Sequence, residues 1–187
     1  PIFEFALLLE LKIRRGECAD FIRGTTPIIV KLLEEIVRKE CGINVEDYCD
    51  CDERGGVPKW NLQKLGNNPV LKQKLDEGFK NRKFQRGPIY SYHLNIIIQS
   101  FSKNKRLRDE VRKIVWMEGR VRNVAAHVVT RITDTDIEKW TNGMNARQIF
   151  KKIQYLAKEA GIPAKEKEWE SYRLLNQMII SSLESLR

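Results

Sequence analysis

The chain has 187 residues, of which 42% are hydrophobic, with seven Phe and four Trp, and its formal net charge is +9. This length and apolar content exclude an intrinsically disordered chain and fit one domain with a substantial core. No apolar run is long enough to span a bilayer, and residues 1–13 carry no signal-peptide cleavage pattern. We therefore expect a cytoplasmic protein with no membrane partner.

Apolar residues recur at helical spacing along most of the chain. In chain order, this pattern predicts helices over residues 2–14, 17–23, 27–41, 70–80, 88–102, 104–132, a short stretch ending at 140, 145–160 and 166–186. Gly-Gly, Pro and Asn-Asn-Pro interrupt residues 43–69, which should form a long loop with one turn near 60–65. No stretch alternates with period two between hairpin turns. We therefore expect an all-α fold, one compact domain over residues 1–187 with about seven to nine helices and no significant sheet.

Two local features refine these expectations. Thr26 followed by Pro27 is typical of a helix start, with Thr26 as the N-cap and Pro27 in the first helical position. In the last helix, Leu175, Met178 and Ile179 share one face with other apolar residues, so this face should point into the core.

Positive charge is concentrated in the middle of the chain. Residues 72–131 contain 15 basic and 5 acidic residues, a net charge of +10, while the remainder has a net charge of −1. Such a region attracts polyanions and accelerates their encounter with the protein. A surface that only maintains solubility would not need to separate its charges so strongly.

The basic region contains a helical segment with two distinct faces, residues 120–132. Arg120, Asn123, His127 and Arg131 follow one another at spacing i, i+3, i+7 and i+11, and Arg122 lies at the edge of this polar arc. Valine and isoleucine occupy the opposite face. A titratable imidazole between guanidinium groups suits phosphate chemistry, and a solvated basic face with a surface histidine is the alternative interpretation.

Other candidate sites carry weaker signals. Cys49 and Cys51, with Cys41 upstream, match no common zinc spacing, so we expect thiols in a loop and no metal site. His93 is expected to be a partly packed helical residue. Phe79, Phe84, Tyr90 and Tyr92 alternate with Lys and Arg and could stack bases, but core packing is the favoured interpretation.

A short motif in the basic region resembles one of a known protein family. Residues 122–127 read Arg-Asn-Val-Ala-Ala-His, which resembles the Arg-polar-x-x-x-His motif of HEPN (higher eukaryotes and prokaryotes nucleotide-binding) ribonucleases. The form is similar to that of the accessory ribonucleases of type III-A CRISPR systems, and residues 3–11 and 19–27 resemble the start of their HEPN domain. The resemblance implies an all-helical domain, a homodimer whose two motifs form one composite site, and metal-independent cleavage of single-stranded RNA in antiviral defence.

The same family bears on the boundaries of the chain. Its full-length members carry an N-terminal Rossmann-like sensor that binds cyclic oligoadenylate, and no such pattern occurs here. We expect the chain to be a C-terminal fragment, with removal of a Met before Pro1 as the alternative. The cyclic oligoadenylate activator is expected only for a sensor domain outside this chain.

The residue types suggest how each group would act. RNA supplies its own nucleophile, the ribose 2′-hydroxyl, so cleavage needs a proton acceptor, a proton donor and positive charge on the phosphorane. His127 can fill either proton role, and Arg122 can stabilise the developing charge. Asn123 could orient His127 or hold the phosphate, while Arg120 and Arg131 are expected to bind RNA. Neither a metal ion nor a cofactor is required.

Two other functions stay open at this point. A HEPN toxin or abortive-infection ribonuclease shares the motif and the chemistry, and a neighbouring antitoxin gene would favour it. A non-catalytic helical RNA-binding module would use the basic face only to hold phosphate. That second alternative predicts that His127→Ala leaves function intact.

Overall fold

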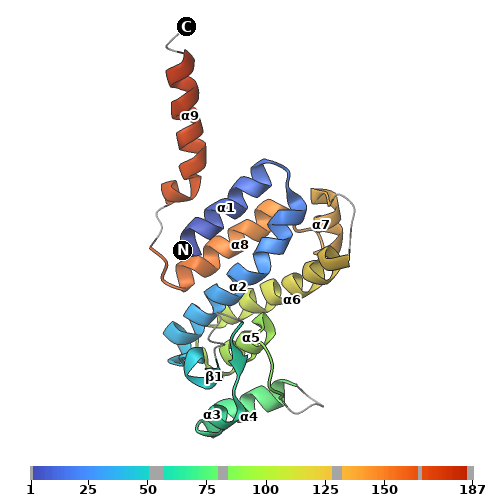
Figure 1. Ribbon diagram of the computed structural model, residues 1–187, viewed down its shortest axis with the longest axis vertical. Helices are drawn as coiled ribbons and strands as arrows, with labels where there is room; N and C mark the ends of the chain where they lie inside the picture. The colour runs from blue at the N-terminus through green and yellow to red at the C-terminus, as the bar shows by residue number, and fades with distance from the viewer. Residues whose placement is uncertain (1, 51–56, 80–83, 128–131, 164–165, 185–187) are drawn as a thin grey trace.

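The computed structural model describes residues 2–50, 57–79, 84–127, 132–163 and 166–184, and for residues 125–127, 166–167 and 183 it describes the backbone alone. Nine α-helices and a minimal sheet occur within these ranges (Figure 1). The elements are α1 (Ile2–Arg14), α2 (Cys18–Cys41), the 3-10 helix η1 (Val45–Tyr48), β1 (Cys49–Asp50), β2 (Lys59–Trp60), α3 (Leu62–Gly66), α4 (Pro69–Gly78), α5 (Ser91–Phe101), α6 (Lys105–His127), α7 (Asp134–Trp140), α8 (Ala146–Glu159), the 3-10 helix η2 (Glu166–Glu170) and α9 (Ser171–Glu184). The predicted all-α fold is confirmed.

Helix α2 is the centre of the fold. It contacts α1, α5, α6 and α8, so most of its surface is buried (Figure 1). Ile29, Leu32, Leu33, Ile36 and Val37 are fully buried along it. Burial of a large aliphatic side chain contributes about 1.5–3 kcal/mol, so this row of residues is a major source of stability.

The predicted helix start at Thr26 and Pro27 is wrong, because α2 continues without a break from Cys18 to Cys41. Packing explains why the helix continues past these residues. A Cβ on Gly24 would lie 2.5 Å from Leu9 Cδ2, so glycine allows α1 to approach α2 closely. The Thr26 hydroxyl does not cap the helix and instead donates a hydrogen bond to Glu118 on α6. Tertiary contacts on both sides of Pro27 outweigh its local cost to the helix.

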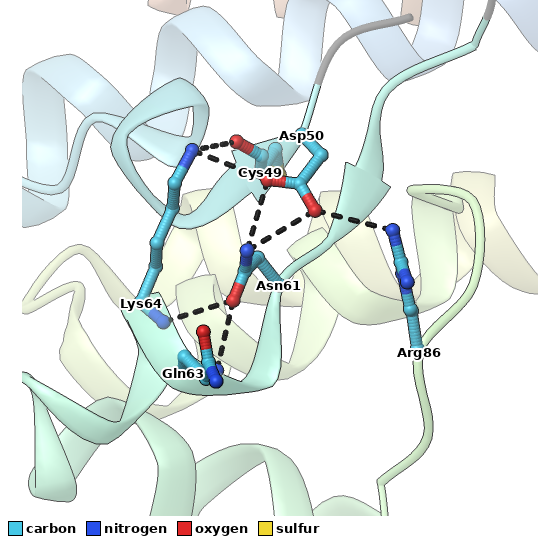
Figure 2. A network of polar contacts seen from close by, with 6 residues as sticks. All are labelled: Cys49, Asp50, Asn61, Gln63, Lys64 and Arg86. Carbon is cyan, nitrogen blue, oxygen red and sulfur yellow. Dashed lines mark hydrogen bonds and ion pairs between the residues drawn. The ribbon is translucent and has the colours of Figure 1, made fainter.

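Residues 43–69, expected to form a long loop, contain short elements fixed by polar contacts. Strands β1 and β2 pair in antiparallel fashion, with Cys49 opposite Trp60. Figure 2 shows Asn61 at the centre of a network in which its amide donates to Asp50 at 2.9 Å and its oxygen accepts from the backbone N–H of Lys64 at 3.0 Å. Arg86 lies 3.2 Å from Asp50, and these contacts lower the pKa of the Asp50 carboxyl, the Asn61 hydrogen bond most of all.

The predicted inward orientation is wrong for Leu175, Met178 and Ile179 of the last helix. Helix α9 extends away from the other helices in Figure 1. Its Leu175, Met178 and Ile179 side chains are 52%, 68% and 49% exposed. Apolar periodicity shows which residues share a face, but it does not show what covers that face. No helix in the described ranges, α9 included, has the length and apolar character needed to cross a membrane.

Candidate active site

Helix α6 carries the Arg/His motif, and the polar residues of the motif that the structure describes face outward. Asn104 caps the helix by accepting a hydrogen bond from the Leu107 backbone N–H at 3.0 Å. Below the arc, the fully buried residues that fix the rotation of the helix are Leu107, Val111, Ile114, Met117 and Val121. Arg120, Arg122 and Asn123 are consequently exposed on the opposite side. The helical backbone reaches His127, whose side chain lies outside the described residues, as does the whole of Arg131.

A buried acid that the sequence analysis missed lies one helical turn before Arg122. Glu118 is 1% exposed. It accepts hydrogen bonds from the Thr26 hydroxyl of α2 and the Ser91 hydroxyl of α5, both at 2.8 Å. Its carboxylate also lies 3.4 Å from the guanidinium of Arg122. Glu118 therefore joins three helices and holds the guanidinium of Arg122, while the side chain of Arg122 is still 42% exposed. The spacing i, i+4 between the two residues was the available sequence signal.

Arg122 borders a cavity of about 580 Å³ between the start of α5 and the middle of α6. Tyr90, Tyr92 and Trp116 line it, and they are 46%, 45% and 41% exposed. The Arg122 guanidinium lies 6.0 Å from the centroid of the Tyr90 ring. On α6, the Arg120 guanidinium lies 4.8 Å from the centroid of the Trp116 ring. The site thus combines exposed aromatic rings with guanidinium groups.

The aromatic residues of the basic region differ in whether they are buried or exposed. Phe84 is buried at 6% exposure and packs edge-on against Trp60, as core packing predicts. Tyr90 and Tyr92 instead face the cavity, so the core-packing prediction is wrong for these two residues. Lys80, Arg82 and Lys83, which alternate with them in sequence, lie outside the described residues.

His93 is a structural residue, which confirms the prediction that it is a packed residue on a helix. It is 7% exposed among aromatic rings, and burial lowers its pKa to about 4. Its Nδ1 accepts hydrogen bonds from the Trp60 indole at 3.0 Å and from the Tyr90 backbone N–H at 3.2 Å. His93 is therefore neutral near pH 7 and carries its proton on Nε2. The sequence contains only two histidines, so His127 is the remaining candidate for proton transfer.

The cysteines lie apart from this site. Cys18 and Cys41 occupy the two ends of α2, and Cys49 lies on β1. Burial raises the pKa of the Cys41 thiol to about 11, which keeps it protonated. Cys51 lies outside the described residues. Across the part of the chain that the structure describes, no three His, Cys, Asp or Glu side chains are grouped to hold a metal ion.

An all-helical domain with an Arg/His motif on an exposed, basic helix has the organisation of a HEPN-type ribonuclease domain. The family model described as "Cas_Csm6 HEPN domain" matches residues 1–180. The chain therefore belongs to this family of HEPN-type ribonuclease domains of CRISPR systems. No curated protein matches the chain.

Proposed function

We propose that this domain is a metal-independent endoribonuclease that cleaves single-stranded RNA in type III CRISPR antiviral defence. The observation that carries the proposal is the position of Arg122. Its guanidinium is anchored by the buried Glu118, opens onto a solvent-accessible cavity, and lies on the same helix as His127. An arginine fixed in this way can present donors to a phosphate without reorganising during the reaction.

The reaction begins with the ribose 2′-hydroxyl of the substrate. One imidazole accepts its proton as the oxygen attacks the adjacent phosphorus, and an acid donates a proton to the leaving 5′-oxygen. Arg122 stabilises the phosphorane, and Asn123 orients His127 or the phosphate. The products are a 2′,3′-cyclic phosphate and a 5′-hydroxyl. Because the substrate provides the nucleophile and the imidazoles move the protons, the reaction needs no metal ion.

The proposed working unit is a symmetric homodimer. One chain supplies a single histidine for acid–base chemistry, because His93 is buried and, with a pKa of about 4, stays neutral near pH 7. A two-fold axis between the α6 helices of two chains would place two copies of Arg122 and His127 in one cleft. Arg120 and Arg131 would line that cleft and hold RNA on either side of the scissile phosphate.

The experiment that tests this function compares three proteins on a single-stranded RNA. His127→Ala should lose at least about 100-fold in cleavage rate, because it removes the proton acceptor or donor. Arg38→Ala is a matched surface control, since Arg38 lies on α2 with 62% of its side chain exposed. It should cleave at the wild-type rate. Near-wild-type cleavage by His127→Ala would refute the catalytic assignment.

The composite site has its own test, in which wild-type chains are mixed with an excess of His127→Ala chains at saturating RNA. If each cleft needs both chains, heterodimers are impaired and the activity of the wild-type chains falls several-fold. Sedimentation should confirm that subunits have exchanged. Unchanged activity in an exchanged mixture would mean that each chain cleaves RNA alone.

A further inference from the structure

Exposed aromatic side chains are concentrated in one place. In the described part of the chain, the aromatic residues with strongly exposed side chains are Phe5, Tyr90, Tyr92 and Trp116. Three of these four line the cavity beside Arg122. Large rings that stay in water, gathered around one concavity, are typical of a binding site.

The surroundings of the rings indicate the chemistry of the ligand. The cavity of about 580 Å³ lies in the range of small-molecule sites, and Arg112 and Asn95 add polar groups to its walls. Guanidinium groups lie over the rings on both walls, Arg122 near Tyr90 and Arg120 near Trp116. Aromatic rings interleaved with cations are the combination that binds single-stranded nucleic acid, because the rings stack on bases and the cations hold phosphates.

We propose that this cavity is a nucleobase subsite, which takes the base of a nucleotide next to the scissile phosphate. The inference rests on the proposed ribonuclease function and names the part of the substrate that the site recognises. Arg122 belongs both to the cavity and to the proposed phosphate site, so a base in the cavity lies within one nucleotide of the reacting phosphate. Tyr92 and Trp116 are the stacking residues on the two walls.

The subsite also accounts for a single-stranded substrate. A paired base is stacked within its helix and cannot enter a cavity whose walls are α5 and α6. An unpaired base enters without breaking a pair, and it positions the phosphate that follows. The subsite therefore selects the strand state by shape and positions the reacting atoms by stacking.

The test uses DNA oligonucleotides with a single ribonucleotide, which allows cleavage at one linkage. A second set carries an abasic residue immediately 5′ or 3′ of that linkage. For the wild type, the abasic residue should lower kcat/KM about 10-fold at one of these two positions, as expected for loss of one stacking contact. Trp116→Ala and Tyr92→Ala should show a similar loss with the intact base and little further loss with the abasic residue.

Two controls separate the subsite from general effects. Phe5→Ala removes an exposed ring from α1, 37% exposed and outside the cavity, and should cleave like the wild type. Tyr92→Phe keeps the ring but loses the hydrogen bond that the Tyr92 hydroxyl donates to the Gly78 carbonyl at 2.7 Å. Tyr92→Phe should retain the difference in kcat/KM between the substrate with the intact base and the abasic substrate. An abasic effect of equal size in the wild type, Trp116→Ala and Tyr92→Ala would overturn the proposal.

Binding measurements distinguish failure of the subsite from failure of the ribonuclease function. The His127→Ala protein should bind the intact oligonucleotide about 10-fold more tightly than the abasic one, and adding Trp116→Ala should remove that difference. If binding depended on the base but the wild type did not cleave RNA, the subsite would stand and the ribonuclease function would be refuted. Cleavage that does not respond to an abasic residue at either position would refute the subsite alone.

Discussion

The two walls of the cavity differ in how they accommodate buried polar groups. On the α6 wall, the buried Glu118 accepts two hydroxyl donors and pairs with Arg122, which extends toward solvent. On the α5 wall, the buried His93 is held neutral among aromatic rings and accepts two N–H donors. The difference indicates that α6 presents charge to a ligand, while α5 provides a rigid aromatic support.

The largest expected effect is on the α6 wall. Arg122→Ala should reduce the RNA cleavage rate at least about 100-fold, because it removes the cation that stabilises the phosphorane. The free energy of unfolding should fall by about 1–3 kcal/mol, because the buried Glu118 carboxylate keeps both hydroxyl donors but loses its counter-ion. Cleavage kinetics and urea denaturation measure the two effects. Arg38→Ala is the matched control. If Arg122→Ala lost activity only to the extent that the protein unfolds, the α6 wall would have no special role in presenting charge.

The next effect belongs to the α5 wall and appears as a pH dependence of stability. The folded protein holds the pKa of His93 at about 4, below the value of about 6.5 in an unfolded chain. The unfolded state therefore binds the proton more tightly. The contribution of neutral His93 to the free energy of unfolding is complete above pH 6.5. It is lost as the pH falls toward 4, by up to about 3 kcal/mol. Denaturation across this range should show a smaller pH dependence for His93→Gln than for the wild type. The same pH dependence in both proteins would mean that folding does not lower the pKa of His93.

A smaller effect tests how the α6 wall is supported. Glu118→Gln keeps an acceptor for one hydroxyl but loses the charge that faces Arg122. We expect kcat to fall about 10-fold with little change in KM, and the free energy of unfolding to fall by about 1–3 kcal/mol. Glu110→Gln, a partly buried acid on the same helix that pairs with Lys113 and Lys152, is the matched control and should leave kcat unchanged. Equal losses of kcat in the two variants would show that Glu118 has no specific role at Arg122.

The smallest effect concerns RNA binding outside the cavity. Affinity should fall steeply with salt, because residues 72–131 carry a net charge of +10. Arg120→Ala should lower the slope of log affinity against log salt by roughly 0.7, the value for one phosphate contact on a single strand. The catalytically inactive His127→Ala protein should keep the wild-type slope. A slope near zero would contradict binding of RNA by this basic face.

The sequence predicted those features that depend on neighbours along the chain. Helical periodicity placed α6 and the exposed side of it that carries Arg120, Arg122 and Asn123, and it identified His93 as a packed residue. Contacts between distant segments were not accessible in this way. Glu118 receives its hydroxyl donors from Thr26 and Ser91, which lie 92 and 27 residues away. For the same reason, the continuation of α2 through Pro27 and the exposure of α9 could not be predicted from local patterns.

The most direct test of the central claim is to incubate the purified chain with a single-stranded RNA in EDTA and to determine the ends of the products. The proposed chemistry predicts cleavage without added metal, with 2′,3′-cyclic phosphate and 5′-hydroxyl ends, and loss of these products in His127→Ala. Activity that EDTA abolishes and Mg²⁺ or Mn²⁺ restores, or products with 5′-phosphate ends, would contradict it.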